Sequence, residues 1–185
     1  MDLKDKIRNI RDYPKPGIVF RDITTLLTDP IAYNYTLDLF CEHFREFDVD
    51  KVLGVEARGF IFGAGLASRF GVGFVAARKP QKLPFHTIRE EYELEYGTDS
   101  LEIHIDSLRA GEQVLVVDDL IATGGTLGAA TKLVERAGAH VAGIAVVVEL
   151  ESFKGFESLK KYKHFSLVQY DEQSSQTTGP RSSDG

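Results

Sequence analysis

Short runs of β-forming residues alternate with helical segments along the middle of the chain, and this alternation limits the possible fold more than any other feature. The runs predict four strands, at residues 51–55, 73–77, 114–117 and 141–148. The neighbouring segments predict three helices, at residues 31–47, 60–70 and 126–137. This rhythm is typical of an α/β fold with a central, mostly parallel sheet flanked by helices. The longest apolar run, 141–148, is expected to be a central strand.

The N-terminal segment, which precedes these elements, is predicted to begin with a short helix. Residues 1–11 are expected to form a short helix, because Leu3, Ile7 and Ile10 fall on one stripe of a helical projection. The segment 13–17 contains two prolines and a glycine, which end that helix.

Two of the predicted helices carry clear end signals. Asp29 can cap the helix at 31–47, and Pro30 suits the first turn of that helix. Gly138 follows the helix at 126–137, where glycine is a common terminator.

Two segments depart from the alternation. Residues 78–97 are polar and lack a clear period, which is typical of a functional flap or a disordered loop. Leu101, Ile103 and Ile105 then alternate with polar residues, as in a half-exposed strand. We therefore expect residues 78–106 to form a hairpin-like arm beside the sheet.

Length and composition limit the organisation and the class of the protein. The 185 residues suffice for one domain, expected at 1–170, followed by a polar tail at 171–185 that is expected to be disordered. The net charge of −6 argues against nucleic-acid binding. The one cysteine excludes an internal disulfide. No apolar run approaches the roughly 20 residues of a membrane span or resembles a signal peptide, so we expect a cytoplasmic protein without membrane contact.

The segment 114–126 carries the strongest chemical signal. An apolar strand is followed by two acids, Asp118 and Asp119, and then by a small-residue loop that opens a helix; the loop residues are Ala122, Thr123, Gly124, Gly125 and Thr126. Glycine amides, hydroxyl groups and a helix N-terminus suit a phosphate. Paired carboxylates beside a phosphate would repel it unless they face another part of the ligand, and ribose hydroxyls would satisfy them. The alternative is an ordinary turn with solvated acids, and no nucleotide P-loop pattern is present.

A second strand-to-helix loop occupies residues 56–59. Arg58 adds fixed positive charge at a predicted helix start, where backbone amides favour anions. Taken alone, this short segment fits a surface turn equally well.

The segment 114–126 resembles the phosphoribosyl pyrophosphate (PRPP) signature of the type I phosphoribosyltransferases. The resemblance extends over roughly residues 7–170 and is strongest to the adenine-specific members, through segments 13–23, 54–60 and 94–97. It implies the type I fold, with a small hood from residues 12–27 and 148–170 and a flexible flap at 78–97. It also implies formation of AMP and pyrophosphate from adenine and PRPP, and a homodimer. Mg²⁺ is expected to be held mainly by PRPP or pyrophosphate and by water, with few or no direct protein ligands.

The resemblance also implies roles for individual residues. The pyrophosphate loop would consist of Glu56, Ala57, Arg58 and Gly59, with a cis peptide bond between the first two. Arg78, Lys79 and Lys82 of the flap would add positive charge, and the counterpart of Arg78 reaches across a dimer interface in the family. For the lysines, the alternative is solvated charge.

The same resemblance places the base and the chemistry. Glu95 would act as the catalytic acid/base, Arg58 would neutralise the leaving group together with Mg²⁺, and Tyr96 would pack on the closed flap. Val19, Phe20 and Arg21 would grip the base, with Leu150 as the opposite apolar wall. The alternative for Val19 and Phe20 is that they are core residues.

Two other functions remain open at this stage. A related transferase for hypoxanthine, guanine or orotate would share the loop at 118–126. A regulator that senses PRPP without chemistry would share it too, but such regulators usually carry an added DNA-binding domain for which this chain has no room.

Overall fold

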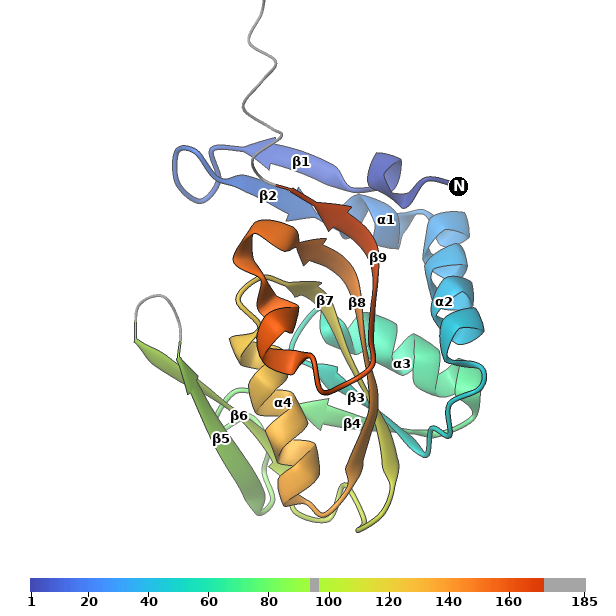
Figure 1. Ribbon diagram of the computed structural model, residues 1–185, viewed down its shortest axis with the longest axis vertical. Coiled ribbons are helices and arrows are strands. Elements are labelled where there is room, and N and C mark those ends of the chain that lie inside the picture. The colour runs from blue at the N-terminus through green and yellow to red at the C-terminus, as the bar shows by residue number, and fades with distance from the viewer. Residues whose placement is uncertain (94–96, 172–185) are drawn as a thin grey trace, which may run out of the picture.

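One parallel sheet forms the centre of the protein, as seen in a computed structural model that describes residues 1–93 and 97–171 (Figure 1). Its five strands lie in the order β4-β3-β7-β8-β9. Their bounds are Gly73–Ala77 for β4, Lys51–Val55 for β3, Gln113–Ile121 for β7, His140–Leu150 for β8 and His164–Tyr170 for β9. The predicted α/β sheet is confirmed, and β8 lies inside it between β7 and β9.

Helices cover both faces of this sheet. The α-helices are α1 (Thr24–Thr28), α2 (Pro30–Phe44), α3 (Gly59–Phe70) and α4 (Gly125–Arg136). Helices α2 and α3 lie over one face, and α4 lies over the other (Figure 1). Side chains of β7 alternate between the two cores: Leu115 and Val117 pack with α2 and α3, whereas Val114 and Val116 pack with α4. Burial on both faces explains why the strand reads as a continuous apolar run.

The predicted helix signals act as expected. The Asp29 side chain accepts hydrogen bonds from the amides of Ile31 and Ala32, at 3.0 and 3.1 Å, so its role as N-cap is confirmed. Gly138 follows α4 in the left-handed conformation, with φ of 81°.

The arm is an antiparallel hairpin, as predicted. It consists of β5 (Thr87–Glu93) and β6 (Thr98–His104), which lie across α4 (Figure 1). A bridge between Arg78 and Glu102 joins its base to the end of β4. Leu101 and Ile103 are fully buried, so β6 is less exposed than the sequence indicated.

The helix predicted at residues 1–11 is wrong. The chain forms a 3-10 helix, η1 (Leu3–Lys6), and then strand β1 (Arg8–Arg11), which pairs antiparallel with β2 (Val19–Asp22). Leu3 and Ile7 are buried as the stripe suggested, but Ile10 pairs with Phe20 across the hairpin. The partner strand is distant in sequence and supplies backbone hydrogen bonds that a helical pattern cannot reveal.

Strand β7 runs four residues beyond its predicted end, through Ile121. Pairing with β8 continues through Ile121 and Glu149, so Asp118 and Asp119 lie within the strand rather than after it. Beyond β8, the chain forms two short 3-10 helices, η2 (Glu151–Phe153) and η3 (Gly155–Leu159), before β9.

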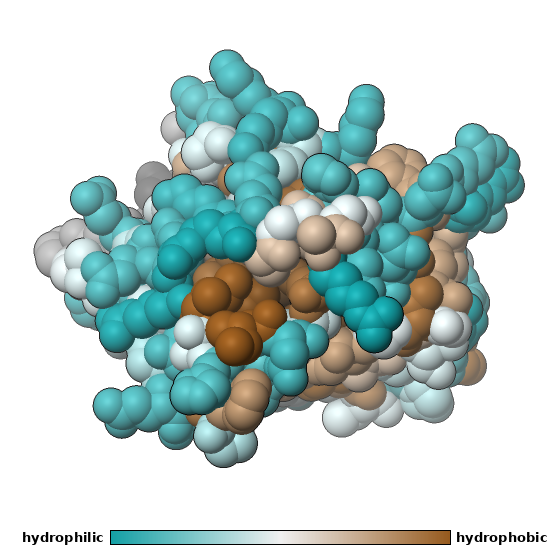
Figure 2. Space-filling view, turned by 90° about the horizontal axis from the view of Figure 1, so that it is seen from below, coloured by the Kyte–Doolittle hydropathy of each residue, from teal (hydrophilic) through white to brown (hydrophobic). Residues whose placement is uncertain are grey.

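The two ends of the sheet differ in character. The carboxyl ends of the strands point toward the β1–β2 hairpin, which carries the predicted base-binding residues Val19, Phe20 and Arg21 (Figure 1). The opposite end carries much hydrophilic surface, with a compact apolar patch near its centre and further apolar surface along the right of the view (Figure 2). Among the described residues, no helix is long and apolar enough to cross a membrane. The predicted tail at 171–185 lies, from residue 172 onward, outside the described residues.

Candidate functional site

A cavity of about 400 Å³ opens at the carboxyl ends of β3 and β7. In parallel sheets, ligands bind at this end of the strands. The cavity is lined by Glu56, Ala57, Arg58, Lys79, Tyr92, Asp118, Asp119, Leu120 and Thr126. The fold therefore brings residues from both predicted loops and from the arm to one hollow.

Two buried carboxyl groups form the wall of this cavity. Asp118 and Asp119 expose 8% and 5% of their surface, and the Asp118 Oδ1 atom accepts a hydrogen bond from the Asp119 amide at 2.8 Å. Burial, followed by the negative charge of Asp119, raises the pKa of Asp118 well above its ordinary value. Two carboxyl groups this close together and this deeply buried are costly to ionise at the same time.

Arg58 compensates the charge of this wall. Its Nε atom lies 2.7 Å from Asp119 Oδ2, but the contact is too bent for a hydrogen bond, so within the described part of the chain this buried oxygen accepts none. The guanidinium also lies 5.7 Å from the ring centre of Phe20. Arg58 thus stands between the acid pair and the predicted base-binding segment.

The loop that carries Arg58 has the predicted backbone. The peptide bond between Glu56 and Ala57 is cis, which confirms that expectation. Gly59 begins α3 directly against β7: a Cβ atom there would lie 2.9 Å from Asp118 Oδ1 and from the Val117 carbonyl oxygen. Only glycine lets the start of α3 approach the acid pair this closely.

Glu56 holds the end of β4 next to this loop. Its Oε2 atom accepts hydrogen bonds from Arg78 Nε and from the Lys79 amide, each at 3.0 Å. Burial acts to raise the pKa of Glu56, but these hydrogen bonds outweigh it and lower the pKa. Arg78 also donates to the Lys82 carbonyl at 3.1 Å, and Lys82 itself is exposed. Arg78 is therefore engaged within its own chain.

Lys79 is paired with the arm. Its Nζ atom donates to Asp99, and to the Tyr92 hydroxyl at 3.1 Å. Burial acts to lower the pKa of Lys79, but the hydrogen bonds to Asp99 and Tyr92 raise it. The ammonium group is charged and faces the cavity with its charge already balanced.

The predicted phosphate loop forms a small hollow of about 140 Å³ at the start of α4. Its lining residues are Leu120, Ile121, Ala122, Thr123, Gly124, Gly125, Thr126 and Leu127. Gly124 adopts φ of 83°, which favours glycine, and Gly125 begins α4. The first amides of a helix have no partner within the helix, so they are available to an anion here.

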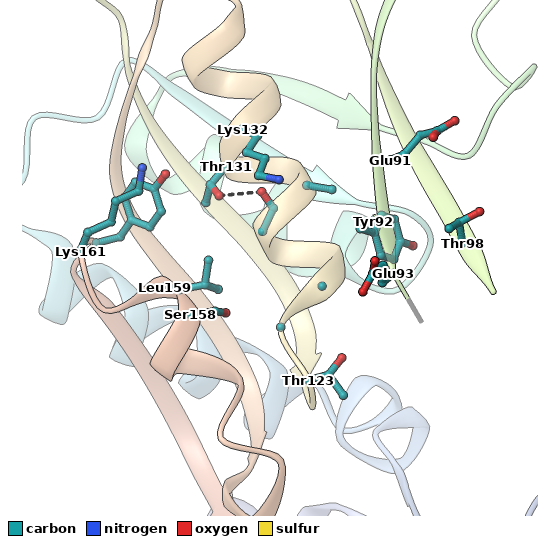
Figure 3. A pocket seen from close by; sticks show the side chains of 15 residues that line it. Glu91, Tyr92, Glu93, Thr98, Thr123, Thr131, Lys132, Ser158, Leu159 and Lys161 are labelled. Atoms are coloured by element: carbon teal, nitrogen blue, oxygen red, sulfur yellow. Dashed lines mark hydrogen bonds between the residues drawn. The ribbon is translucent and has the colours of Figure 1, made fainter. Parts of the chain in front are cut away.

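A larger cavity of about 620 Å³ lies on the other side of this loop, between the arm and η3 (Figure 3). Thr123 lies at its lower end in that view, Glu93 comes from the arm, and Ser158 and Leu159 lie beside the start of α4. A Cβ atom on Gly125 would lie 3.0 Å from the Glu93 carbonyl oxygen. The end of the arm thus touches the phosphate loop.

The predicted base segment is strand β2. Val19 and Phe20 are half-buried, so neither is a fully buried core residue. Phe20 contacts Tyr13 edge to face, with 5.3 Å between ring centres. Its contact with Arg58 brings this segment to the cavity.

Arg21 is buried, and its guanidinium stacks on the ring of Tyr170 at 3.9 Å from the ring centre. It also donates to the Asn9 side chain at 2.7 Å. Tyr170 in turn pairs with Leu150, the predicted apolar wall, across β8 and β9. Arg21 and Leu150 therefore lie in one connected group at the hood.

Glu95 and Tyr96 lie outside the described residues, so their predicted roles stay predictions. Sequence reasoning missed Tyr92 and Asp99, which hold Lys79 at the cavity. The sequence contains one signal for Tyr92, which is the one aromatic residue in the otherwise charged segment 89–93 of β5. Asp99 carries no such signal, because its role depends on a residue 20 positions away.

Comparison with known proteins identifies the family of this chain. Residues 24–178 match the family model described as "Phosphoribosyl transferase domain". A Clostridium perfringens protein named adenine phosphoribosyltransferase is 54% identical over 171 residues, which cover 92% of this chain and 99% of that protein.

Two solved structures share the fold. Adenine phosphoribosyltransferase from Thermoanaerobacter pseudethanolicus has a TM-score of 0.88 and 49% identity, with 91% of this chain and 98% of that chain covered. The enzyme from Saccharomyces cerevisiae, complexed with an imino-altritol bisphosphate and adenine, has a TM-score of 0.85 and 39% identity, with 89% and 96% covered. The chain therefore belongs to the phosphoribosyltransferase family and has its type I fold.

Proposed function

We propose that the protein transfers the 5-phosphoribosyl group of PRPP to adenine and releases AMP and pyrophosphate, as a purine salvage enzyme. The observation that carries this proposal is a pair of adjoining hollows, which share Leu120 and Thr126, where the acid pair, the Arg58 loop and the start of α4 meet. In charge, the acid pair suits the sugar hydroxyls of PRPP, the Arg58 loop suits its pyrophosphate, and the start of α4 suits its 5′-phosphate. The adenine specificity rests on the relatives and on the sequences of segments 16–23 and 94–97.

The phosphate loop and the acid pair would hold the ribose. The 5′-phosphate is placed on the amides at residues 122–126, where the helix dipole of α4 favours an anion. The 2′ and 3′ hydroxyls are placed on Asp118 and Asp119. The buried Asp119 Oδ2 atom supports this assignment, since a sugar hydroxyl would give it the hydrogen bond it does not make within the described chain.

The Arg58 loop would hold the leaving group. The Arg58 guanidinium forms an ion pair with Asp119, with 2.7 Å between Nε and Oδ2. When the sugar hydroxyls take over that carboxylate, Arg58 becomes available to the pyrophosphate. It would then balance the charge that develops as the bond between C1′ and the pyrophosphate oxygen breaks. Lys79 and Arg78, at the end of β4, would contribute by exchanging their ion pairs with Asp99 and Glu56 for the pyrophosphate, and Lys82 would add positive charge from the exposed side.

The base would enter between β2 and the end of β8. Phe20 is placed against the purine ring, with Leu150 opposite, and backbone groups near Val19 and Arg21 would read its polar edge. The adenine nitrogen then bonds to C1′ as pyrophosphate departs, and a proton leaves the base. We assign that proton transfer to Glu95, on the strength of the family resemblance, with Tyr96 packing over the closed site.

Mg²⁺ is proposed as the cofactor, bound mainly to oxygens of PRPP or pyrophosphate and to water. The site offers carboxylate oxygens from Asp118 and Asp119, which is the donor type that Mg²⁺ prefers. When bound, the ion would neutralise negative charge on the leaving pyrophosphate.

We also propose a cytoplasmic location and a homodimeric assembly. The sheet edge beside the Arg58 loop supports the dimer, because Ile61 and Phe74 expose 41% and 38% of their surface there. Fractionation of cells that express the protein tests the location.

The reaction is tested by measuring pyrophosphate release with PRPP, Mg²⁺ and each of adenine, hypoxanthine, guanine and orotate. We expect release with adenine and formation of AMP. Release with another base alone would assign a different transferase. PRPP binding without release for any base would identify a sensor instead of an enzyme.

A further inference from the structure

The turn after β8 packs directly against the phosphate loop. Gly155 is buried, and a Cβ atom built on it would lie 2.2 Å from the Ala122 carbonyl oxygen and 2.7 Å from Cγ1 of Ile121. In the opposite direction, a Cβ atom on Gly124 would lie 2.5 Å from the Gly155 carbonyl oxygen. The two backbones therefore touch with no room for a side chain on either glycine.

The surrounding turn cannot retreat easily from this contact. Phe156 and Leu159 are buried in the core shared with α4, and Phe156 stacks on His164 with 4.0 Å between ring centres. The Ser158 hydroxyl donates to the Gly155 carbonyl at 3.1 Å. Lys154 precedes Gly155 in the left-handed conformation, and its amide donates to the Glu151 carbonyl at 3.0 Å. The turn is thus fixed on both sides of Gly155.

The position of this contact gives it a functional consequence. Ala122 and Gly124 belong to the loop where the 5′-phosphate is placed, and Ser158 and Leu159 lie beside the start of the same helix (Figure 3). A displaced carbonyl at Ala122 would rotate the peptide group whose amide belongs to Thr123. Anion binding at a helix start depends on where such amides point.

We infer that Gly155 is a positioning residue for the phosphate loop: its missing side chain lets the turn at 151–159 support Ala122–Gly124 in the geometry that accepts the 5′-phosphate. The inference rests on the proposed function, since it concerns the same ligand. It adds a residue from a different part of the chain, which does not touch the reacting atoms.

The test compares Gly155→Ala with Gly128→Ala. The φ angle of Gly155 lies outside the left-handed region, so alanine there meets a steric problem and not a backbone one. At Gly128, the same Cβ atom would meet only Cδ2 of Leu159, at an ordinary 3.9 Å. Binding of ribose 5-phosphate and of pyrophosphate is measured by titration calorimetry for both variants and the parent.

We expect Gly155→Ala to weaken ribose 5-phosphate by about tenfold or more, a loss of about 1.4 kcal/mol or more in binding free energy. Its affinity for pyrophosphate should remain that of the parent, because the proposed pyrophosphate loop at 56–59 follows a different strand, β3. Gly128→Ala should bind both ligands as the parent does. Unchanged affinity of Gly155→Ala for ribose 5-phosphate would overturn the inference, as would an equal loss for both ligands.

A second variant covers the case in which Gly155→Ala folds poorly. Gly155→Ala combined with Ile121→Ala removes the side-chain part of the overlap but leaves the Ala122 carbonyl in place. We expect this double variant to fold and still to bind ribose 5-phosphate weakly. Restored binding would show that side-chain packing, not the loop backbone, is responsible, and the inference would be wrong. If the parent converts adenine and PRPP into AMP but both glycine variants bind ribose 5-phosphate equally well, the inference about Gly155 fails and the proposed function stands. If the parent does not form AMP, the proposed function itself fails.

Discussion

At the scale of single residues, Asp118 shows the conflict between stability and ligand binding most clearly. Burial, together with the charge of Asp119, raises the pKa of Asp118 well above the ordinary value of 3.8. Between the unfolded and the folded pKa, the folded chain binds more protons than the unfolded chain, so the stability falls as the pH rises through that window. At pH values above the folded pKa, Asp118 is ionised in both states, and the full loss of folding stability remains. A buried acid that destabilises the fold is easiest to understand as a ligand-binding group.

Asp118→Asn is therefore expected to raise the melting temperature of the ligand-free protein at pH 7.5. Each unit of pKa elevation corresponds to about 1.4 kcal/mol, and each kcal/mol to about 2–4 °C in a chain of this size. The gain in melting temperature should shrink toward zero as the pH falls to the pKa of Asp118 in the unfolded chain. Below that pH the Asp118 carboxyl group is neutral in both the folded and the unfolded protein. Thermal melts from pH 4 to 8 measure this.

Two further measurements complete that prediction. The exposed Asp48→Asn serves as control and should follow the parent at every pH. The same Asp118→Asn protein should lose affinity for PRPP, because the hydroxyl-accepting carboxylate is gone. A variant that is less stable than the parent at pH 7.5 would contradict the account of the pKa.

At the scale of elements, the hood depends on one stack between two strands. Arg21 of β2 lies 3.9 Å above the ring of Tyr170 at the end of β9, and β2 otherwise pairs only with β1 among the described strands. Cation–π stacking at a buried site contributes about 2 kcal/mol. The stack therefore sets where the proposed base segment stands relative to Leu150.

We expect Tyr170→Leu to raise KM for adenine about fivefold to tenfold, in line with the loss of roughly 1 kcal/mol or more of positioning energy. KM for PRPP should change little, because the phosphate loop and the acid pair remain in place. Tyr170→Phe is the matched control: within the described chain the buried Tyr170 hydroxyl has no hydrogen-bond partner, so its removal should leave both constants as in the parent. Equal effects of Leu and Phe would refute the role of the ring.

Elements whose signals are local could be predicted from the sequence. The strand, glycines and helix around residues 114–126 follow each other directly, so both the loop and its strand could be inferred. The hairpin β1–β2 could not, because the pairing of Ile10 with Phe20 has no local signature. The contact of Gly155 with the phosphate loop could not be predicted for the same reason. Its neighbour Ala122 is more than 30 residues away in the sequence, and only the fold brings the two backbones into contact.

At the scale of the whole molecule, the edge strand β4 and the adjacent helix α3 leave apolar side chains exposed. Phe74 packs over Gly54 and Gly63, where a Cβ atom would lie 2.7 and 2.9 Å from its ring, yet 38% of its surface remains exposed. Ile61 of the adjacent α3 exposes 41%. Exposed apolar side chains beside an unpaired strand edge suit a protein interface. This edge continues into Arg78 and Glu56, so a second copy placed here would adjoin the pyrophosphate loop.

The proposed homodimer is therefore expected to depend on Ile61. The parent should elute with twice the chain mass of 20.6 kDa in size-exclusion chromatography with light scattering, and Ile61→Asp should shift it toward the monomer because a buried carboxylate would stand unpaired. Phe153→Asp is the control, since Phe153 also exposes 41% of its surface but lies in η2, between β8 and β9, which are on the opposite side of the sheet from β4. If the interface also orders Arg78, the Ile61→Asp protein should bind pyrophosphate more weakly while its affinity for ribose 5-phosphate persists. A monomeric parent at micromolar concentration, or an Ile61→Asp protein that stays dimeric, would exclude this edge as the interface.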